Sequence, residues 1–474
     1  MPAGLLLSDL APDVIFSIFA CCDISSVVST AQTCRYLHRL AFDISVWLVL
    51  LDNLRRRSIL DRTCTPDIKV LSTDEIIDIV KRLITGPKTW TTPLDAADPV
   101  AEVTREIEVH PKIRVGGGIL HWENMAKLLP SGRYVLFNNW RALECWNVAD
   151  DRLVWKHASA IEHASVLEFA ADEVEDSVVI LICVRSYPRN YDDRKNYLEV
   201  VDVDLQTGAH NSLLITRAPD SDYDNPFCWP VIRGALAAVG TNSQSNTYMI
   251  VNWRTQSHLT LKCNPHIVLK TSLDGEDQVH LISNDALLAY WAPTLSIDDP
   301  GPAEFAVILV EAIPKLGTFV DPDADQSFSY MSVIESPIQH GSYRIWIHGT
   351  LHTTDADTDT DASNTTTGGL LCYQLSILIG GSGDVKPQWR KQRRATGAGM
   401  SLYHTIPYSG HGLFYTNPAG YRMFSPTASE SEYGSPQCQP RVEFRGSGDH
   451  VDVGLYSGTI TYSTSNSIVI RYYR

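Results

Sequence analysis

Apolar residues in the first hundred positions recur with the period of an α-helix. Val14, Ile15, Ile18 and Phe19 fall on one face of a single helix. Pro12 suits the first position of that helix, because its missing backbone N–H has no intrahelical partner there. The pattern therefore predicts an amphipathic helix that starts at Pro12 and packs one side against other apolar segments.

The same period predicts further helices downstream. Asp23 and Ser25 offer N-caps for a second helix, and a short third helix follows it. Residues 46–51 are apolar almost all round, so we expect this stretch to be buried from several sides. Ser72 or Thr73 caps a longer helix, which Gly86 ends. These helices are too few for a large independent domain and indicate a small module followed by a helical linker.

The pattern changes near residue 101 from helical spacing to short strand-like runs. Residues 134–137, 178–184 and 468–472 are runs of this kind, and Gly, Asn, Asp and Pro turns separate such runs. No helical stripe of useful length follows in the sequence. We therefore expect a multidomain chain with a small all-α module, a helical linker and an all-β domain.

A strand-rich segment of this size needs a way to protect its sheet edges, and radial repetition in a β-propeller is the common solution. Seven units would average about 53 residues, longer than the ~40–45 of a typical WD-type blade. Residues 103–109 precede the first unit as an unpaired strand, which we expect to pair with residues 468–472 and close the ring. Seven blades are predicted, with six or eight as alternatives. Strand clusters begin near Trp122, Val166, Trp229, Gln278, Phe328, Ser401 and Asp449.

Composition and charge narrow the class of protein. Of the 474 residues, 44% are hydrophobic and 20% charged, as in folded proteins that are soluble in water. The formal net charge of −16 argues against nonspecific nucleic-acid binding, because phosphates would be repelled, and favours basic partners.

Cysteine usage and the longest apolar runs bear on the cellular compartment. The ten cysteines form no CxxC pair, which is typical of reduced thiols in an intracellular protein. The longest apolar run has seven residues, 178–184, whereas a membrane span needs ~20. No secretory or transit signal is visible at the start. We therefore expect a protein of the cytoplasm, the nucleus or both, without a membrane partner.

Residues 10–47 resemble the F-box, and they align to that family's usual pattern without a gap. The residues that carry the resemblance include Asp13, Val14, Asp23, Ala41 and Asp43, together with those given below. Two positions depart from the family's pattern: Ala11 stands where proline is usual, and Cys22 where leucine is usual. Residues 74–90, followed by the sequence PSGRY, are similar to the linker and propeller of large fungal F-box families. The domains implied are an F-box at 1–50, a helical linker at 51–100 and a propeller at 101–474.

The resemblance implies a partner and a role. F-box proteins bind the Skp-type adaptor of cullin–RING ubiquitin ligases, so the expected function is a substrate-recruiting subunit of an SCF-type ligase without catalytic chemistry of its own. The substrate protein and its binding residues stay unknown. A scaffold that acts without ubiquitination and a propeller hydrolase are the alternatives. The residues expected to bind the adaptor are Leu10, Pro12, Ile15, Ile18, Phe19, Val27, Val28, Cys34, Arg35, Leu40 and Trp47.

The remaining motifs give no sign of a cofactor or a metal. Asp355, Asp357, Asp359 and Asp361 alternate with small residues but lack the glycine and glutamate of a calcium loop. The histidines show no HxH or HExxH spacing. The basic run at 390–394 is read as a loop between blades that faces solvent, with a nuclear signal or an acidic-substrate contact as alternatives.

Overall fold

The structure is a computed structural model. It describes residues 6–474 apart from the segments 62–67, 92–98, 114–124, 140–141, 188–193, 222, 242–246, 263–277, 282–285, 292–294, 297–298, 301–302, 310–314, 322–326, 353–365, 380–384, 399–405, 417–419, 427–438 and 446–450. The aspartate run at 355–361 lies outside the described residues.

The first part of the chain is helical, as predicted. Pro12 occupies the first position of α1, and the Asp23 carboxylate accepts a 2.7 Å hydrogen bond from the backbone N–H of Ser26 at the start of α2. Ser72 and Glu75 cap α5 reciprocally. None of the described helices is long and apolar enough to cross a membrane. The helical elements are η1 (Leu7–Asp9), α1 (Pro12–Cys21), α2 (Ile24–Ala31), α3 (Arg35–Ala41), α4 (Ile44–Arg56), η2 (Ile68–Val70), α5 (Thr73–Thr85) and η3 (Lys88–Trp90).

One hydrophobic core joins all five α-helices. Ile15 and Phe19 of α1 pack in the same cluster as Trp47 and Leu51 of α4 and Val80 of α5. The F-box-like helices and the linker therefore form one packed unit with no break in the core at residue 50. We call α1 to α5 the helical module.

Among the described residues, six antiparallel sheets have four strands each. The first three are β2 (Ala126–Leu128), β3 (Tyr134–Asn138), β4 (Leu143–Asn147) and β5 (Arg152–Lys156); β6 (Ala164–Val174), β7 (Ser177–Ser186), β8 (Lys195–Asp204) and β9 (His210–Arg217); and β10 (Phe227–Arg233), β11 (Leu236–Thr241), β12 (Thr247–Asn252) and β13 (Ser257–Lys262).

The other three four-stranded sheets complete most of the all-β region. They are β14 (Gln278–Leu281), β15 (Ala286–Trp291), β18 (Ala303–Leu309) and β19 (Lys315–Asp321); β20 (Ser327–Glu335), β21 (Ser342–His352), β22 (Thr366–Ile379) and β23 (Val385–Ala398); and β26 (Val451–Val453), β27 (Thr459–Ser463), β28 (Ile468–Tyr473) and β1 (Val103–Val109). Two strand pairs stand apart: β16 (Leu295–Ser296) with β17 (Asp299–Pro300), and β24 (Gly412–Thr416) with β25 (Gly420–Phe424).

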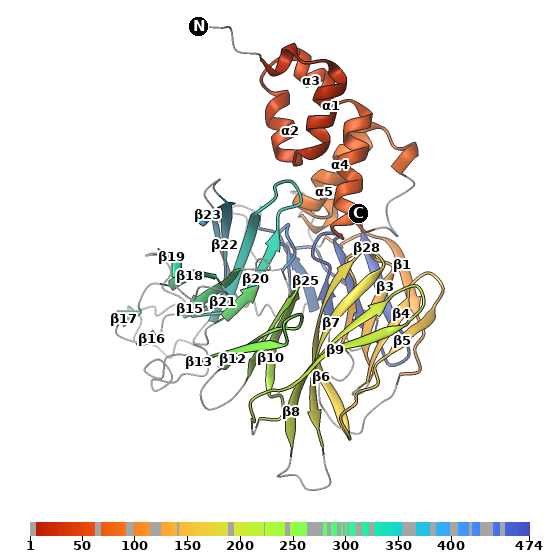
Figure 1. Cartoon of the computed structure of the whole chain (residues 1–474), viewed down its shortest axis with the longest axis vertical. Coiled ribbons are helices and arrows are strands. Elements are labelled where there is room, and N and C mark those ends of the chain that lie inside the picture. Colours follow the sequence, from red (N-terminus) through yellow and green to blue (C-terminus); the bar gives the residue numbers. More distant parts are fainter. Residues whose placement is uncertain are drawn as a thin grey trace.

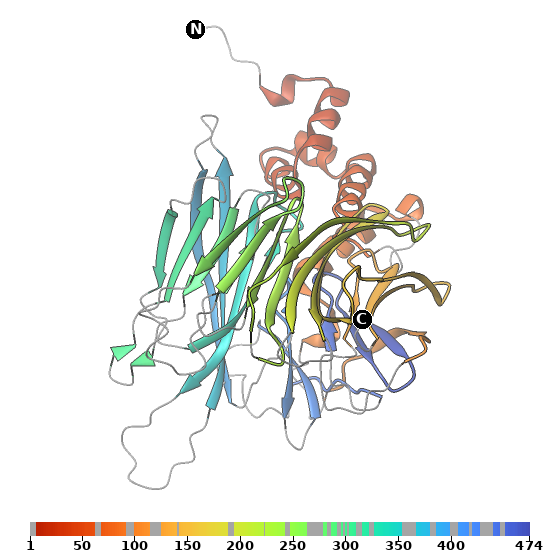
Figure 2. The ribbon, with the colours of Figure 1, turned by 60° about the horizontal axis from the view of Figure 1, so that its bottom comes forward.

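The sheets are arranged as a β-propeller. The first strands of successive sheets contact one another, β26 with β2, β6 with β10, β10 with β14 and β14 with β20, so these strands surround the axis of the ring. Figures 1 and 2 show the sheets side by side around this axis, with the helical module on one side of them. The expected order of a helical region followed by a β-propeller is confirmed.

The prediction of seven blades is wrong, because the described residues contain fewer than seven complete four-stranded sheets. The unit expected to begin near Ser401 contributes only the pair β24 and β25 to them. Apolar runs in the sequence indicate where strands lie. How many complete sheets the strands form depends on which strands pair, and the apolar pattern of one repeat does not show that pairing.

Ring closure follows the prediction. Strand β1 pairs antiparallel with β28, with Val103 opposite Tyr473 and Val109 opposite Ile468. The last sheet is therefore built from both ends of the all-β segment, which removes two open edges at once.

The prediction that the basic run at 390–394 is a loop is also wrong. The run lies in β23, paired with residues 371–374 of β22, and not in a loop.

Candidate functional site

The helical module is fixed to the propeller by a charged network, which we call the junction network. The Arg57 guanidinium, just after α4, lies 2.8 Å from the Glu335 carboxylate at the end of β20. Arg233, at the end of β10, lies 3.0 Å from the same carboxylate and 3.5 Å from the carboxylate of Asp172 in β6. The side chains of Arg57 and Glu335 are largely buried, so their attraction is screened less than that of a surface pair. The network joins α4 to three different sheets.

A second seam joins the end of the helical module to the last sheet. The backbone N–H of Thr89 donates a 3.0 Å hydrogen bond to the carbonyl of Arg474. Trp90 is fully buried, with its ring 5.6 Å from that of Tyr473 and 5.5 Å from that of His411. Two independent seams therefore fix the orientation of the module relative to the ring.

One face of α1 stays exposed. Ile15 and Phe19 turn into the core, whereas the apolar side chains of Val14 and Ile18 are 46% and 36% exposed. Val14 and Ile18 lie four residues apart and therefore one above the other on the helix. The exposed Leu7 precedes them in η1. We call Val14 and Ile18 the α1 face.

The structure divides the eleven predicted adaptor contacts into three groups. Pro12, Ile18, Cys34 and Arg35 are exposed, and Leu10 and Val28 are half-buried. The remaining five, Ile15, Phe19, Val27, Leu40 and Trp47, are buried in the helical core.

These five side chains belong to the core of the helical module, and their role as adaptor contacts stays a prediction. Val14, which is not in the predicted set, is an exposed apolar residue on the same helix. Its spacing to Ile18 places the two side chains on one face, since residues four apart are neighbours on a helix.

A polar cluster lies near the axis of the propeller, on first strands of their sheets. It comprises Lys127 on β2, Glu168 on β6, Asp452 on β26 and Asn225 just before β10. We call these four residues the axial cluster. The Asn225 side-chain amide donates a 3.3 Å hydrogen bond to Glu168 Oε1. The strand β2 belongs to the sheet between those of β6 and β26, so Lys127 stands between the two carboxyl groups along the ring.

Burial dominates the electrostatics of the axial cluster. It raises the pKa of Glu168 to about 7, against the lowering effects of the Asn225 hydrogen bond and the Lys127 charge. Burial likewise raises the pKa of Asp452 to about 6, again opposed by Lys127. Sequence reasoning missed this cluster because its members are far apart in the chain and form no motif.

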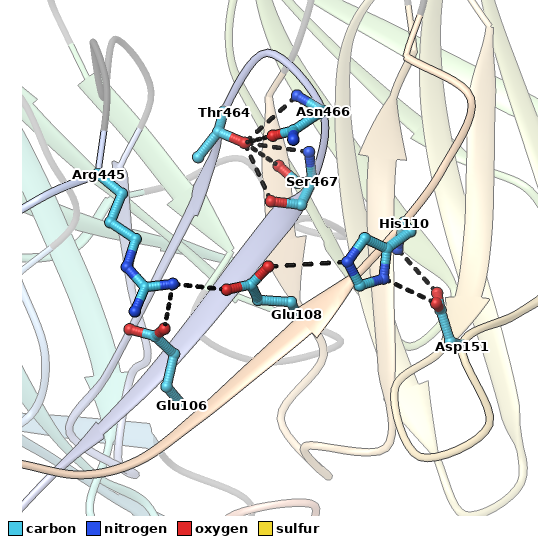
Figure 3. A network of polar contacts seen from close by, with 8 residues as sticks. All are labelled: Glu106, Glu108, His110, Asp151, Arg445, Thr464, Asn466 and Ser467. Atoms are coloured by element: carbon cyan, nitrogen blue, oxygen red, sulfur yellow. Dashed lines mark hydrogen bonds and ion pairs between the residues drawn. The ribbon is translucent and has the colours of Figure 1, made fainter.

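A third polar network reinforces the closure of the ring (Figure 3). The Arg445 guanidinium lies 2.9 Å from the carboxylate of Glu106 and 2.7 Å from that of Glu108, both on β1. His110 follows β1 and lies 2.9 Å from the carboxylate of Asp151, in the turn between β4 and β5 of the neighbouring sheet. These contacts are mostly exposed, so each adds little to the free energy of folding. Their main effect is to fix the register of β1 against its neighbours.

Among the described residues, no group of three His, Cys, Asp or Glu side chains lies close enough together to hold a metal ion.

Comparison with known proteins does not assign the chain to a family. No protein-family model matches the chain. No curated protein matches it either.

Solved β-propellers resemble the chain at low identity. The β-propeller domain of Cps50 (Swd1) from Myceliophteria thermophila has a TM-score of 0.44 and 10% identity, over 78% of this chain and 99% of that one. The C-terminal WD40 domain of Sif2 has a TM-score of 0.37 and 11% identity, over 79% and 99%. An oligogalacturonate lyase in complex with manganese has a TM-score of 0.33 and 10% identity, over 74% and 76%. The assignment of the fold therefore rests on the strand pairing of this chain.

Proposed function

We propose that this protein is a substrate-recruiting subunit of an SCF-type cullin–RING ubiquitin ligase. Its F-box-like residues 10–47 bind the Skp-type adaptor, and its propeller binds the substrate protein. The observation that carries the proposal is the α1 face, an apolar surface on the helix with the densest match to the F-box pattern. The proposed location is the cytoplasm, the nucleus or both.

The physical support comes from what the helical module buries and what it leaves exposed. Its inner face is already used by the core that joins α1 to α5, so Val14 and Ile18 contribute nothing to that core. Apolar side chains that share one exposed helical face gain free energy when a partner covers them, at about 25 cal/mol per Å². The junction network then holds a bound adaptor in a fixed position relative to the propeller.

Binding of the full-length chain to a purified Skp-type adaptor by isothermal titration calorimetry tests this proposal. Replacing Val14 and Ile18 together by aspartate places two unpaired charges in the interface, which costs at least about 3 kcal/mol and weakens binding by at least about 100-fold. Val49→Asp is the matched control, because Val49 is 39% exposed but lies on α4. Absence of wild-type binding at micromolar concentrations, with the helices shown to be folded by circular dichroism, contradicts the proposal. Equal loss of binding in the control contradicts it as well.

A scaffold would bind the same adaptor without directing ubiquitination. Reconstituted ubiquitin transfer to a protein captured by the propeller distinguishes the two roles, because only the ligase subunit supports it.

One observation favours a second candidate, a propeller hydrolase: the two carboxyl groups of the axial cluster have raised pKa values, as catalytic acids often do. The neighbouring thiol of Cys183 argues against nucleophilic catalysis there, because burial raises its pKa well above the usual value. We therefore interpret the axial cluster as a binding site.

A further inference from the structure

We propose that the axial cluster binds the side chain of a lysine or an arginine presented by a partner polypeptide. The inference rests on the proposed function only in identifying that polypeptide with the recruited substrate. It is carried by two observations: the charge balance of the cluster and the hydrogen bonds that its groups lack.

The charge balance is one negative charge in excess when both carboxyl groups are ionised. Glu168 and Asp452 contribute two negative charges, and Lys127 contributes one positive charge. A single monovalent cation therefore neutralises the cluster. The overall charge of −16 has the sign that attracts a basic segment toward the protein.

The carboxylate oxygens of the cluster are poorly satisfied. Within the described part of the chain, no hydrogen bond or ion pair reaches the Asp452 carboxylate or the Lys127 ammonium, and Glu168 accepts the one bond from Asn225. A carboxylate accepts up to about four hydrogen bonds, so these half-buried groups have acceptor sites left for a partner. An ammonium or guanidinium group brings three to five donors and a positive charge to these oxygens.

The desolvation of these acids supports the same ligand chemistry. Burial raises the pKa values of Glu168 and Asp452 because their ionised forms have exchanged water for too few protein partners. A cationic side chain supplies the missing partner and stabilises the ionised forms. A neutral or anionic side chain offers no such gain.

The junction network and the axial cluster lie along the same strand, β6. Asp172 lies four residues after Glu168 on β6, and four residues of extended strand span roughly 13 Å. At that level Arg57 and Arg233 meet the Glu335 carboxylate, beside the helical module. The carboxylates of Glu335 and Asp172 balance these two guanidinium charges, so the junction network is electrically neutral and the cluster's excess negative charge lies at Glu168 and Asp452.

Three acetylated and amidated glycine pentapeptides with a central lysine, arginine or norleucine test the inference on the full-length protein by calorimetry. We expect the lysine or the arginine peptide to bind at least 10-fold more tightly than the norleucine peptide. Glu168→Gln and Asp452→Asn should each weaken that binding by 10-fold or more. Glu162→Gln is the control, because its carboxylate is almost fully exposed and should change nothing.

A variant with the opposite expected effect guards against loss of folding. Lys127→Met removes the internal cation and should tighten binding of the basic peptide severalfold. Equal binding of the norleucine peptide, or unchanged binding in both carboxyl variants, overturns the inference. Adaptor binding by these variants should equal that of the wild type. The two proposals can therefore fail separately, because the peptides report on the axial cluster and the adaptor reports on the α1 face.

Discussion

His411 should make the stability of the junction between helices and propeller depend on pH. The side chain is 1% exposed, its Nδ1 lies 3.0 Å from the Ser409 hydroxyl, and the ring of Trp90 packs against it. Burial lowers the pKa of His411 from 6.5 to about 3, because an imidazolium in this place would lack water. The perturbation is His411→Gln, which removes the titrating group.

The expected magnitude follows from the two pKa values. An unfolded chain binds a proton at this histidine below pH 6.5, whereas the folded protein resists it down to about pH 3. The contribution of His411 to the free energy of unfolding is therefore present above pH 6.5 and is lost as the pH falls. Between pH 7 and pH 5 the loss amounts to about 2 kcal/mol.

Two other groups act in the opposite direction over the same range. Glu168 and Asp452 have raised pKa values, so the folded protein binds protons more readily than the unfolded chain and gains stability as the pH falls from 7 to 5. Their combined gain is on the order of 3 kcal/mol, which would mask the effect of His411 in the wild-type curve alone. The informative quantity is therefore the difference between the variant and the wild type.

Urea unfolding of both proteins at pH 7 and pH 5 measures that difference. We expect the free energy of unfolding of His411→Gln, taken relative to the wild type, to rise by about 2 kcal/mol on going from pH 7 to pH 5. A relative value that changes by less than about 0.5 kcal/mol would refute the reasoning, because His411 would then titrate alike in both states.

Four further variants test the packing. Trp47→Ala should destabilise the helical module by about 3–5 kcal/mol, measured by chemical unfolding followed through helical circular dichroism, since its side chain is buried. Gly132→Ala should cost at least about 1–2 kcal/mol in the same assay, because φ is +72° and an added Cβ would collide with a linker carboxylate. Deleting residues 465–474 removes β28 and should abolish the cooperative thermal transition of the propeller; a transition that survives would show that the ring tolerates an open edge. Arg57→Met should speed proteolysis between helices and propeller, whereas Arg56→Met, which breaks an exposed pair, should not.

Features that depend on neighbouring residues in the chain were predicted best from the sequence. The helix caps at Asp23 and Ser72 and the helix start at Pro12 lie at the positions that these residue types predict. The pairing of β1 with β28 was predicted because a strand without a neighbour has unpaired backbone groups that another strand must cover. This requirement concerns the whole ring, but the unpaired strand is visible in the sequence.

Positions set by tertiary packing escaped prediction. Val14 and Ile15 are both apolar and adjacent, so the helical period alone does not decide which of them faces the core. The axial cluster brings together Lys127, Glu168 and Asp452 only because a ring places its first and last sheets side by side. The basic run in β23 has the composition of a loop, and its strand pairing with β22 overrides that preference.

Closure of the ring by β1 and β28 also sets an order of events during synthesis. Val109 and its partner Ile468 are 359 positions apart, so β1 leaves the ribosome long before the strand that it needs. At a rate of about 5–20 residues per second, β1 waits for roughly 20–70 seconds. The buried core residues of the helical module end at Leu83, so the module can begin to fold during this time, while Thr89 still lacks the Arg474 carbonyl. A nascent chain could therefore present the α1 face before it has a finished propeller, and the completed ring is what orients that face.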